Sequence, residues 1–105
     1  MLKHANESNF NEMTGKGLVL VDFFATWCGP CKMLGPVLED MASDRDSIDI
    51  VKVDIDESMN LARQYGIMSV PTLVLFKDGQ VVAQTSGFQP KESIQQFIDN
   101  YKYQF

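Results

Sequence analysis

Apolar residues follow two kinds of spacing along this chain, continuous runs and one-sided helical patterns. The longest run, Leu18–Ala25 (LVLVDFFA), is interrupted only by Asp22, as is typical of a strand buried on both faces. Ile48–Ile55 (IDIVKVDI) predicts a second strand. The segment between them places apolar residues on one helical face, at Leu34, Val37, Leu38 and Met41. Strand, helix and strand together predict a βαβ unit with parallel strands and a right-handed crossover.

Two further strands are predicted to form a hairpin. Thr72–Phe76 and Gln80–Thr85 are rich in residues that favour strands. The Asp78-Gly79 pair between them is a strong signal for a hairpin turn. Hairpin strands run antiparallel, whereas the strands of a βαβ unit run parallel. The sheet is therefore predicted to be mixed.

Three other segments have helical patterns. They are a weak helix over Ser8–Thr14, a short helix over Glu57–Tyr65 that Gly66 stops, and a last helix that begins near Pro90. Helices are thus expected on both faces of the sheet. The predicted fold class is α/β, with a central mixed β-sheet flanked by helices on both faces, in one domain over residues 1–105.

Composition and charge narrow the functions that this domain can have. The chain has 105 residues, and its net charge of −5 argues against nucleic acid as a partner. The N-terminal segment MLKHANESNF lacks the apolar core of a signal peptide, and no apolar run approaches the roughly 20 residues of a membrane span. We therefore expect a cytoplasmic monomer with no membrane partner, in a reducing compartment where structural disulfides are unusual.

Both cysteines lie in Phe23–Met33 (FFATWCGPCKM), three positions apart, and such a pair has three possible roles. A closed metal site needs about four ligands, but this chain offers two thiols and the distant His4. A structural disulfide across so short a ring constrains the unfolded chain by only roughly 1.9 kcal/mol. The sequence favours the third role, a reversible redox pair.

Local geometry supports the redox interpretation. Cys28 falls where the first predicted strand ends and a helix begins, so its sulfur is expected to face free N–H groups that stabilise a thiolate. Residues three apart on a helical turn are close enough for a disulfide. Cys31, one turn inside the helix, is expected to be more buried and a poorer first nucleophile. Pro30 suits the first helical turn, and Pro36 is expected to kink the helix.

Trp27–Lys32 (WCGPCK) resembles the active-site signature of the thioredoxin family. Further matches follow in family order and spacing: VDFFATWCGPCK at 21–32, Pro36, KVDID at 52–56, YGIMSVPT at 65–72, FKDG at 76–79 and Gly87. The resemblance covers essentially the whole chain. It implies a thioredoxin fold and a protein-disulfide reductase of the cytosol that cycles between a Cys28–Cys31 dithiol and disulfide.

The resemblance also implies partners and roles for single residues. The implied partners are disulfide-containing protein substrates and a thioredoxin reductase that uses flavin and NADPH, with no cofactor or metal bound to this chain. The implied catalytic residues are Cys28 as attacking thiol, Cys31 as resolving thiol, Asp22 as a buried carboxylate beneath them, Lys52 as its basic neighbour and Pro71 as a cis-proline. The implied docking rim for substrates consists of Trp27, Gly29, Pro30, Val70 and Gly87.

Taken by themselves, several of these residues also have plainer interpretations. Asp22 is either a solvated or backbone-satisfied carboxylate, or a desolvated acid with a raised pKa that takes a proton from Cys31. Lys52 is either a solvated strand residue or a cation that moderates the charge of Asp22. Trp27 is either a packing residue or part of an exposed docking surface. Four methionines are expected to be core or gap-filling residues rather than ligands, namely Met33, Met41, Met59 and Met68.

Two other functions remain open at this point. The resemblance implies that oxidases and isomerases of the same fold often place a His between the cysteines, where this chain has Gly29-Pro30. A scaffold or chaperone subunit with this fold would not need its thiols. The chain also departs from the family at Phe24, where Trp is usual, at Gly35 within the predicted helix, and at Phe88.

Overall fold

The structure, a computed structural model, describes residues 2–102. Five strands form one sheet in the order β1-β3-β2-β4-β5. The strands are β1 (Leu2–Ala5), β2 (Leu18–Phe24), β3 (Asp49–Asp54), β4 (Thr72–Lys77) and β5 (Gln80–Ser86). The helices are α1 (Phe10–Thr14), α2 (Gly29–Ala42), α3 (Met59–Gln64) and α4 (Lys91–Lys102). Every predicted strand and helix is present, and β1 is an additional strand that the sequence pattern did not indicate.

The sheet is mixed, as predicted. Strands β1, β3 and β2 run parallel to one another, while β4 pairs antiparallel with both β2 and β5. The β4–β5 turn has positive φ at Asp78 (48°) and Gly79 (83°), as a two-residue type I′ turn requires. The predicted hairpin and its turn are both confirmed.

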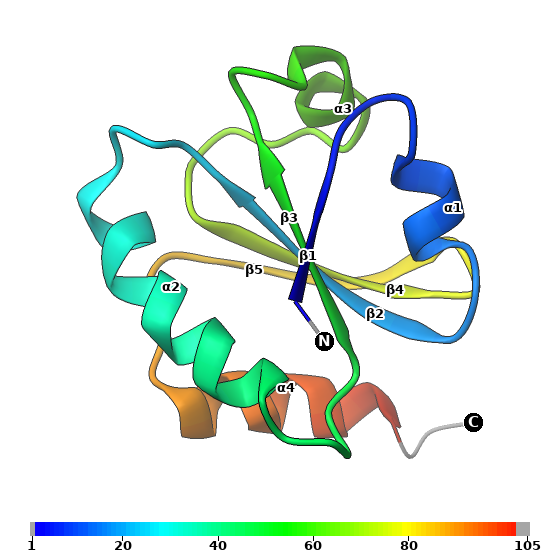
Figure 1. Cartoon of the computed structure of the whole chain (residues 1–105), viewed down its shortest axis with the longest axis vertical. Coiled ribbons are helices and arrows are strands. Elements are labelled where there is room, and N and C mark those ends of the chain that lie inside the picture. The colour runs from blue at the N-terminus through cyan, green and yellow to red at the C-terminus, as the bar shows by residue number, and fades with distance from the viewer. Residues whose placement is uncertain (1, 103–105) are drawn as a thin grey trace.

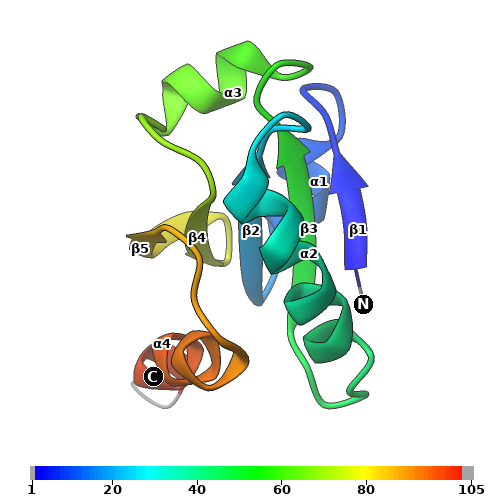
Figure 2. The same cartoon turned by 90° about the vertical axis from the view of Figure 1, so that its left-hand side faces the viewer.

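Two helices cover each face of the sheet (Figures 1 and 2). Phe10 of α1 and Leu61 of α3 belong to one core cluster, together with Val21 of β2. The second cluster contains apolar residues of α2 and α4, together with Leu20 of β2. Because side chains alternate along a strand, Asp22 points to the same face as Leu20. The carboxyl group of Asp22 therefore lies on the face that α2 covers.

Strand β2 leads through a short loop into α2 (Figure 1), so the cysteines lie at the carboxyl end of a central strand. Pro30 occupies the first turn of α2, where its missing N–H has no partner to lose. Pro36 lies inside α2, and the helix continues through it to Ala42.

The methionine prediction is mostly wrong. Met41 is buried in the core between α2 and α4, but Met33, Met59 and Met68 are exposed. The exposed fraction of Met68 is 94%, and this residue lies in the loop that precedes β4. A thioether side chain is unbranched and adaptable enough for either environment, so its position along the sequence does not separate core from surface.

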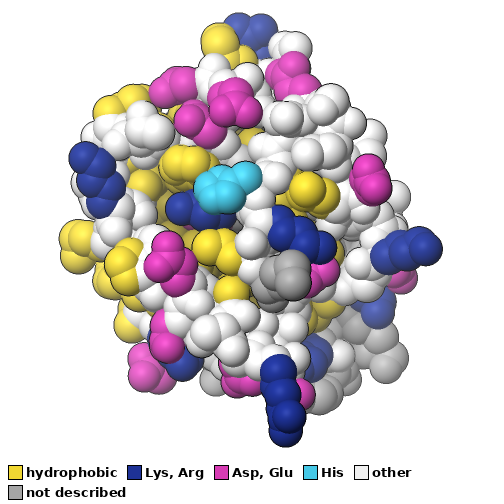
Figure 3. All heavy atoms as spheres, viewed as in Figure 1, with side chains coloured by type: hydrophobic (Ala, Val, Ile, Leu, Met, Phe, Trp, Pro, Cys, Tyr) yellow, Lys and Arg dark blue, Asp and Glu magenta, His cyan; other side chains and the backbone are white. Residues whose placement is uncertain are grey.

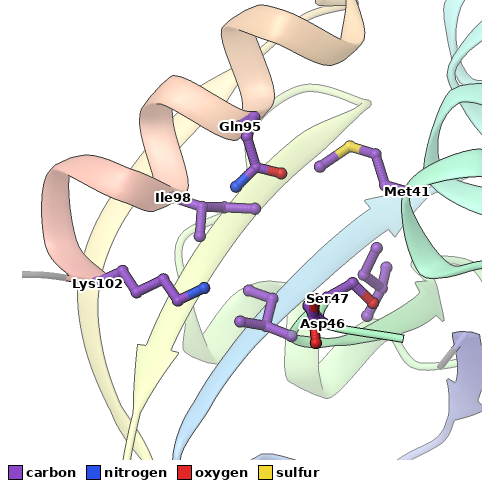
Figure 4. A pocket seen from close by; sticks show the side chains of 8 residues that line it. Met41, Asp46, Ser47, Gln95, Ile98 and Lys102 are labelled. Carbon is purple, nitrogen blue, oxygen red and sulfur yellow. The ribbon is translucent and has the colours of Figure 1, made fainter. Parts of the chain in front are cut away.

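A small, partly open cavity lies between α2, α4 and the loop before β3 (Figure 4). Its volume is about 20 Å³, which is room for about one water molecule. The Ser47 hydroxyl lines this cavity and has no hydrogen-bond partner among residues 2–102. Neither cysteine lines the cavity, and its size excludes a substrate.

Candidate active site

The two cysteines are joined in the structure as a disulfide with a Cα–Cα separation of 5.2 Å. Cys28 is the N-cap residue of α2, and its Sγ accepts a hydrogen bond from the backbone N–H of Cys31 at 3.2 Å. A sulfur that carries negative charge at this position gains both from that donor and from the helix dipole. The predicted position of Cys28 at the start of the helix is thus confirmed.

The expected difference in burial between the cysteines is wrong. The exposed fraction is 5% for Cys28 and 6% for Cys31. Cys28 is covered from a distant part of the chain, because its Sγ lies 3.6 Å from the carbonyl oxygen of Val70. The two sulfurs therefore differ in their electrostatic surroundings at the helix terminus rather than in their exposure.

The loop before β4 faces Cys28. The Val70–Pro71 peptide bond is cis, as the resemblance implied. Gly87 is joined to this loop, since its N–H donates a hydrogen bond to the carbonyl oxygen of Pro71 at 2.9 Å. Gly87 has a φ of +90°, a backbone conformation that residues other than glycine rarely adopt. The structure thus brings the carbonyl group of Val70 next to Cys28, 42 residues away in the sequence, and joins Gly87 to the same loop through Pro71.

The other three rim residues flank Cys28 in the sequence and are all exposed, namely Trp27, Gly29 and Pro30. The exposed fraction of Trp27 is 66%, so the packing interpretation of this residue is wrong. Its indole N–H donates a hydrogen bond to Oδ2 of Asp56 at 2.9 Å. Asp56 is a residue of the site that the sequence analysis missed, because nothing local in KVDID indicates a partner 29 residues away.

Asp22 is the one charged residue in the central strand β2, and its exposed fraction is 1%. No group among residues 2–102 offers a hydrogen bond to its Oδ1 atom. Burial raises the pKa of Asp22 from 3.8 to about 6, and the positive charge of Lys52 lowers the pKa in part. The interpretation of Asp22 as a solvated carboxylate is therefore wrong.

Lys52 lies beside Asp22 in the sheet, because the two residues pair in the parallel register of β2 and β3. Its Nζ atom lies 4.5 Å from the centroid of the Phe24 ring. On the other side, Lys52 pairs with His4 of β1, which is exposed (the cyan side chain in Figure 3). Lys52, Phe24 and Cys31 also line one open groove of about 350 Å³ between α2 and the sheet.

The comparisons with known proteins agree with this geometry. The thioredoxin family model matches residues 1–100. The chain belongs to the thioredoxin family. It is 51% identical to the thioredoxin of Staphylococcus haemolyticus over 96 residues, which cover 90% of this chain and 92% of that protein. It is 47% identical to the thioredoxin of Bacillus subtilis over 98 residues, which cover 92% of this chain and 94% of that protein.

Solved thioredoxin structures share the fold. The thioredoxin of Malassezia sympodialis superimposes with a TM-score of 0.87 at 36% identity, over 97% of this chain and 91% of the other. A thioredoxin variant from Halobacterium salinarum superimposes with a TM-score of 0.89 at 38% identity, over 99% of this chain and 93% of the other. The mixed sheet with helices on both faces is thus a thioredoxin fold. The protein is a thiol–disulfide oxidoreductase of this family, and its redox group is the Cys28–Cys31 pair.

Within residues 2–102, no group of three or more His, Cys, Asp or Glu side chains is arranged to hold a metal ion. No helix in the same range has the length and apolar character to cross a membrane.

Proposed function

We propose that this protein reduces disulfide bonds in cytoplasmic proteins as a monomer, and that a flavin-containing thioredoxin reductase restores its dithiol with electrons from NADPH. The observation that carries the proposal is the position of the Cys28 sulfur at the N-terminus of α2, where it accepts the N–H of Cys31. That position stabilises Cys28 as a thiolate, and the thiolate is the nucleophile in disulfide exchange. Neither electron transfer requires a cofactor on this chain.

In the first step, the Cys28 thiolate attacks one sulfur of a substrate disulfide. The substrate S–S bond breaks, the first substrate sulfur leaves as a thiolate, and a mixed disulfide forms between Cys28 and the second substrate sulfur. We assign docking of the substrate to the rim of Trp27, Gly29, Pro30, Val70 and Gly87. The exposed indole of Trp27 and the cis-prolyl loop that contacts Cys28 support this assignment, and we expect an extended substrate segment to bind along them.

In the second step, Cys31 attacks the Cys28 sulfur. The mixed disulfide breaks, the second substrate thiolate leaves, and the Cys28–Cys31 bond forms, so that two electrons have moved to the substrate. Cys31 must first lose its proton, and we assign its removal to Asp22. A carboxylate with a pKa of about 6 is a stronger base than an ordinary aspartate and is still largely ionised at pH 7. Lys52 limits how far burial raises that pKa.

The equilibrium potential of the Cys28–Cys31 couple tests the proposed direction of electron flow. A reductant is expected to have a potential clearly below the cytosolic glutathione poise of about −220 to −260 mV. The measurement is equilibration with a reference dithiol, with Trp27 fluorescence or thiol alkylation as the signal. A potential near about −180 mV, the range of the secretory compartment, would instead identify an oxidase or isomerase.

Replacing Gly87 by Ala is expected to weaken substrate docking. A methyl group there meets no neighbouring atom within 4 Å, so it projects into space that the proposed substrate occupies. We expect KM for a protein disulfide to rise about fivefold, with kcat little changed, because a lost rim contact of about 1 kcal/mol corresponds to that factor. Steady-state kinetics with a protein substrate and a reductase supply the measurement.

Gly17→Ala is the matched control for Gly87→Ala. Gly17 also has a positive φ (68°) and open space around its Cα, but it precedes β2, at the end of the strand away from the cysteines. Both variants are expected to lose about 1–2 kcal/mol of stability through backbone strain. If Gly17→Ala raises KM as much as Gly87→Ala does, strain rather than docking explains the effect.

A further inference from the structure

The ammonium group of Lys52 links Asp22 and Phe24 on the α2 side of the sheet. Asp22 and Phe24 lie two residues apart on β2, so their side chains point to the same face. Lys52 is the register partner of Asp22 on β3. The Lys52 side chain begins beside the carboxyl group, and its Nζ lies over the Phe24 ring, 4.5 Å from the centroid. A cation at this distance over a ring face is attracted by the quadrupole of the ring.

The ring is the partner that holds this ammonium. Among residues 2–102, no carboxylate oxygen lies within 4 Å of Lys52 Nζ; the ion pairs of that range join Lys3 to Asp49 and Lys91 to Asp40. Lys52 nevertheless acts on Asp22 through its charge. The strength of that action depends on where the ammonium rests, because a charge interaction weakens with distance and with exposure to water.

The resting place of the ammonium is the groove that also reaches Cys31. Phe24, Lys52 and Cys31 line this groove together with residues of the first turns of α2. The groove is open to solvent along one side, and the Lys52 side chain is half-buried in it. An ammonium released from the ring therefore has water within reach. The aromatic face keeps the charge inside the groove.

We propose that Phe24 is a positioning residue for disulfide exchange: its ring holds the Lys52 ammonium in the groove and so fixes how strongly Lys52 acts on the buried carboxyl group of Asp22. The inference rests on the proposed function, in which Asp22 accepts the proton of Cys31. Phe24 touches neither substrate nor the reacting atoms in this scheme. Its effect passes through Lys52.

Other titratable groups around the groove do not replace this contact. From α2, Cys31 packs at the site, and Lys32 and Glu39 line the same groove with opposite charges. From β1, exposed His4 pairs with Lys52 and meets the Phe24 ring edge-on, with centroids 6.5 Å apart. Asp54 follows Lys52 on the same face of β3. The neighbours from β4 and α4, Leu73, Ile94 and Ile98, are apolar.

The test is a set of substitutions read by titration of Asp22 itself. The carboxyl carbon signal of Asp22 in isotopically labelled, oxidised protein reports its pKa directly. Phe24→Leu keeps an apolar cover but removes the ring face, so Lys52 moves into solvent and the Asp22 pKa is expected to rise by about half a pH unit, a threefold change in proton affinity. Phe24→Trp keeps a ring face and is expected to cause no rise.

The Lys52→Gln background separates positioning from a general effect on packing. Lys52→Gln alone is expected to raise the Asp22 pKa, and adding Phe24→Leu to it is expected to change nothing further. The proposal is overturned if Phe24→Leu leaves the pKa unchanged or lowers it, if Phe24→Trp raises it equally, or if the rise persists without Lys52. Denaturant unfolding confirms that each variant is folded.

A different result would contradict the proposed function. If Asp22→Asn resolves mixed disulfides as fast as the unchanged protein, Asp22 is not the proton acceptor. The titration needs no turnover, so the link from Phe24 through Lys52 to Asp22 is still measured in that case. Conversely, a failed titration test leaves the Cys28–Cys31 chemistry intact.

Discussion

A Cys31→Ser variant is expected to accumulate covalent complexes with its protein substrates, whereas a Cys28→Ser variant is expected to form none. Cys28 carries the sulfur that accepts the backbone N–H of residue 31, so we expect it to make the first attack even when the Cys31 thiol is absent. Without Cys31 the mixed disulfide has no internal thiol to resolve it. Turnover with a reductase should fall at least about 1,000-fold in both variants, because each removes a residue that one reaction cycle needs.

The measurement is non-reducing electrophoresis followed by mass spectrometry of the trapped partners. The Cys28→Ser/Cys31→Ser double variant is the matched control, since it keeps the fold but has no thiol in this chain. A binding subunit or scaffold would keep its activity in that double variant, and a disulfide reductase would lose it. Recovery of the same covalent complexes from Cys28→Ser as from Cys31→Ser would contradict the assigned roles of the two thiols.

The elements that carry the cysteines were predictable because their local patterns agree with the fold. Leu18–Ala25 is nearly all apolar, and β2 proved to be buried on both faces in the middle of the sheet. The one polar residue in that run, Asp22, was therefore conspicuous in the sequence. Asp78-Gly79 fixed the hairpin for a similar reason, since these two residues tolerate the positive φ values that the turn needs.

Strand β1 was not predictable in the same way. Its sequence, LKHA, is four residues long and has no apolar run or clear alternation. It is a strand because β3 supplies a parallel hydrogen-bonding edge, with Leu2 opposite Ile50 and Ala5 opposite Val53. Short edge strands of this kind are determined by their neighbours rather than by their own propensity.

The contacts that join distant segments at the site could not be predicted from the sequence pattern either. Val70 covers the Cys28 sulfur, and Cys28 is as buried as Cys31, whereas the sequence predicted Cys28 to be the more exposed of the two. Asp56 binds the indole of Trp27, and Phe24 holds the ammonium of Lys52. Each of these contacts joins segments that are at least 28 positions apart in the sequence. The family resemblance identified most of the residues involved, but the contacts themselves required the fold.

Replacing Asp22 by Asn is expected to make the stability of the oxidised protein much less dependent on pH. The folded-state pKa of Asp22 is about 6, above its value of 3.8 in an unfolded chain. The folded state therefore binds this proton more tightly than the unfolded state, and its stability falls as pH rises through the range between these two values. At 1.36 kcal/mol per pH unit, the loss amounts to about 3 kcal/mol above pH 7.

The experiment compares denaturant unfolding of the unchanged protein and Asp22→Asn at about pH 4 and about pH 8. Asn cannot ionise, so the variant should gain about 2.4 kcal/mol relative to the unchanged protein between these two conditions, because part of the total loss has already occurred at about pH 4, just above the unfolded-state pKa of 3.8. Lys52→Gln provides a second comparison. Because Lys52 lowers the Asp22 pKa, its removal should enlarge the loss on going to about pH 8. A stability difference between Asp22→Asn and the unchanged protein that is independent of pH would contradict the raised pKa.

A buried carboxylate that destabilises the fold at neutral pH requires a compensating role. Asp22 lies in the central strand, where an apolar residue would pack without this penalty. The same desolvation that costs about 3 kcal/mol also makes the carboxylate a stronger base than an ordinary aspartate, as the proposed removal of the Cys31 proton requires. Relative to the unchanged protein, Asp22→Asn is therefore expected to gain stability between about pH 4 and about pH 8. It is also expected to resolve mixed disulfides more slowly. A variant that gained stability without losing resolution rate would show that the buried charge has no part in the exchange.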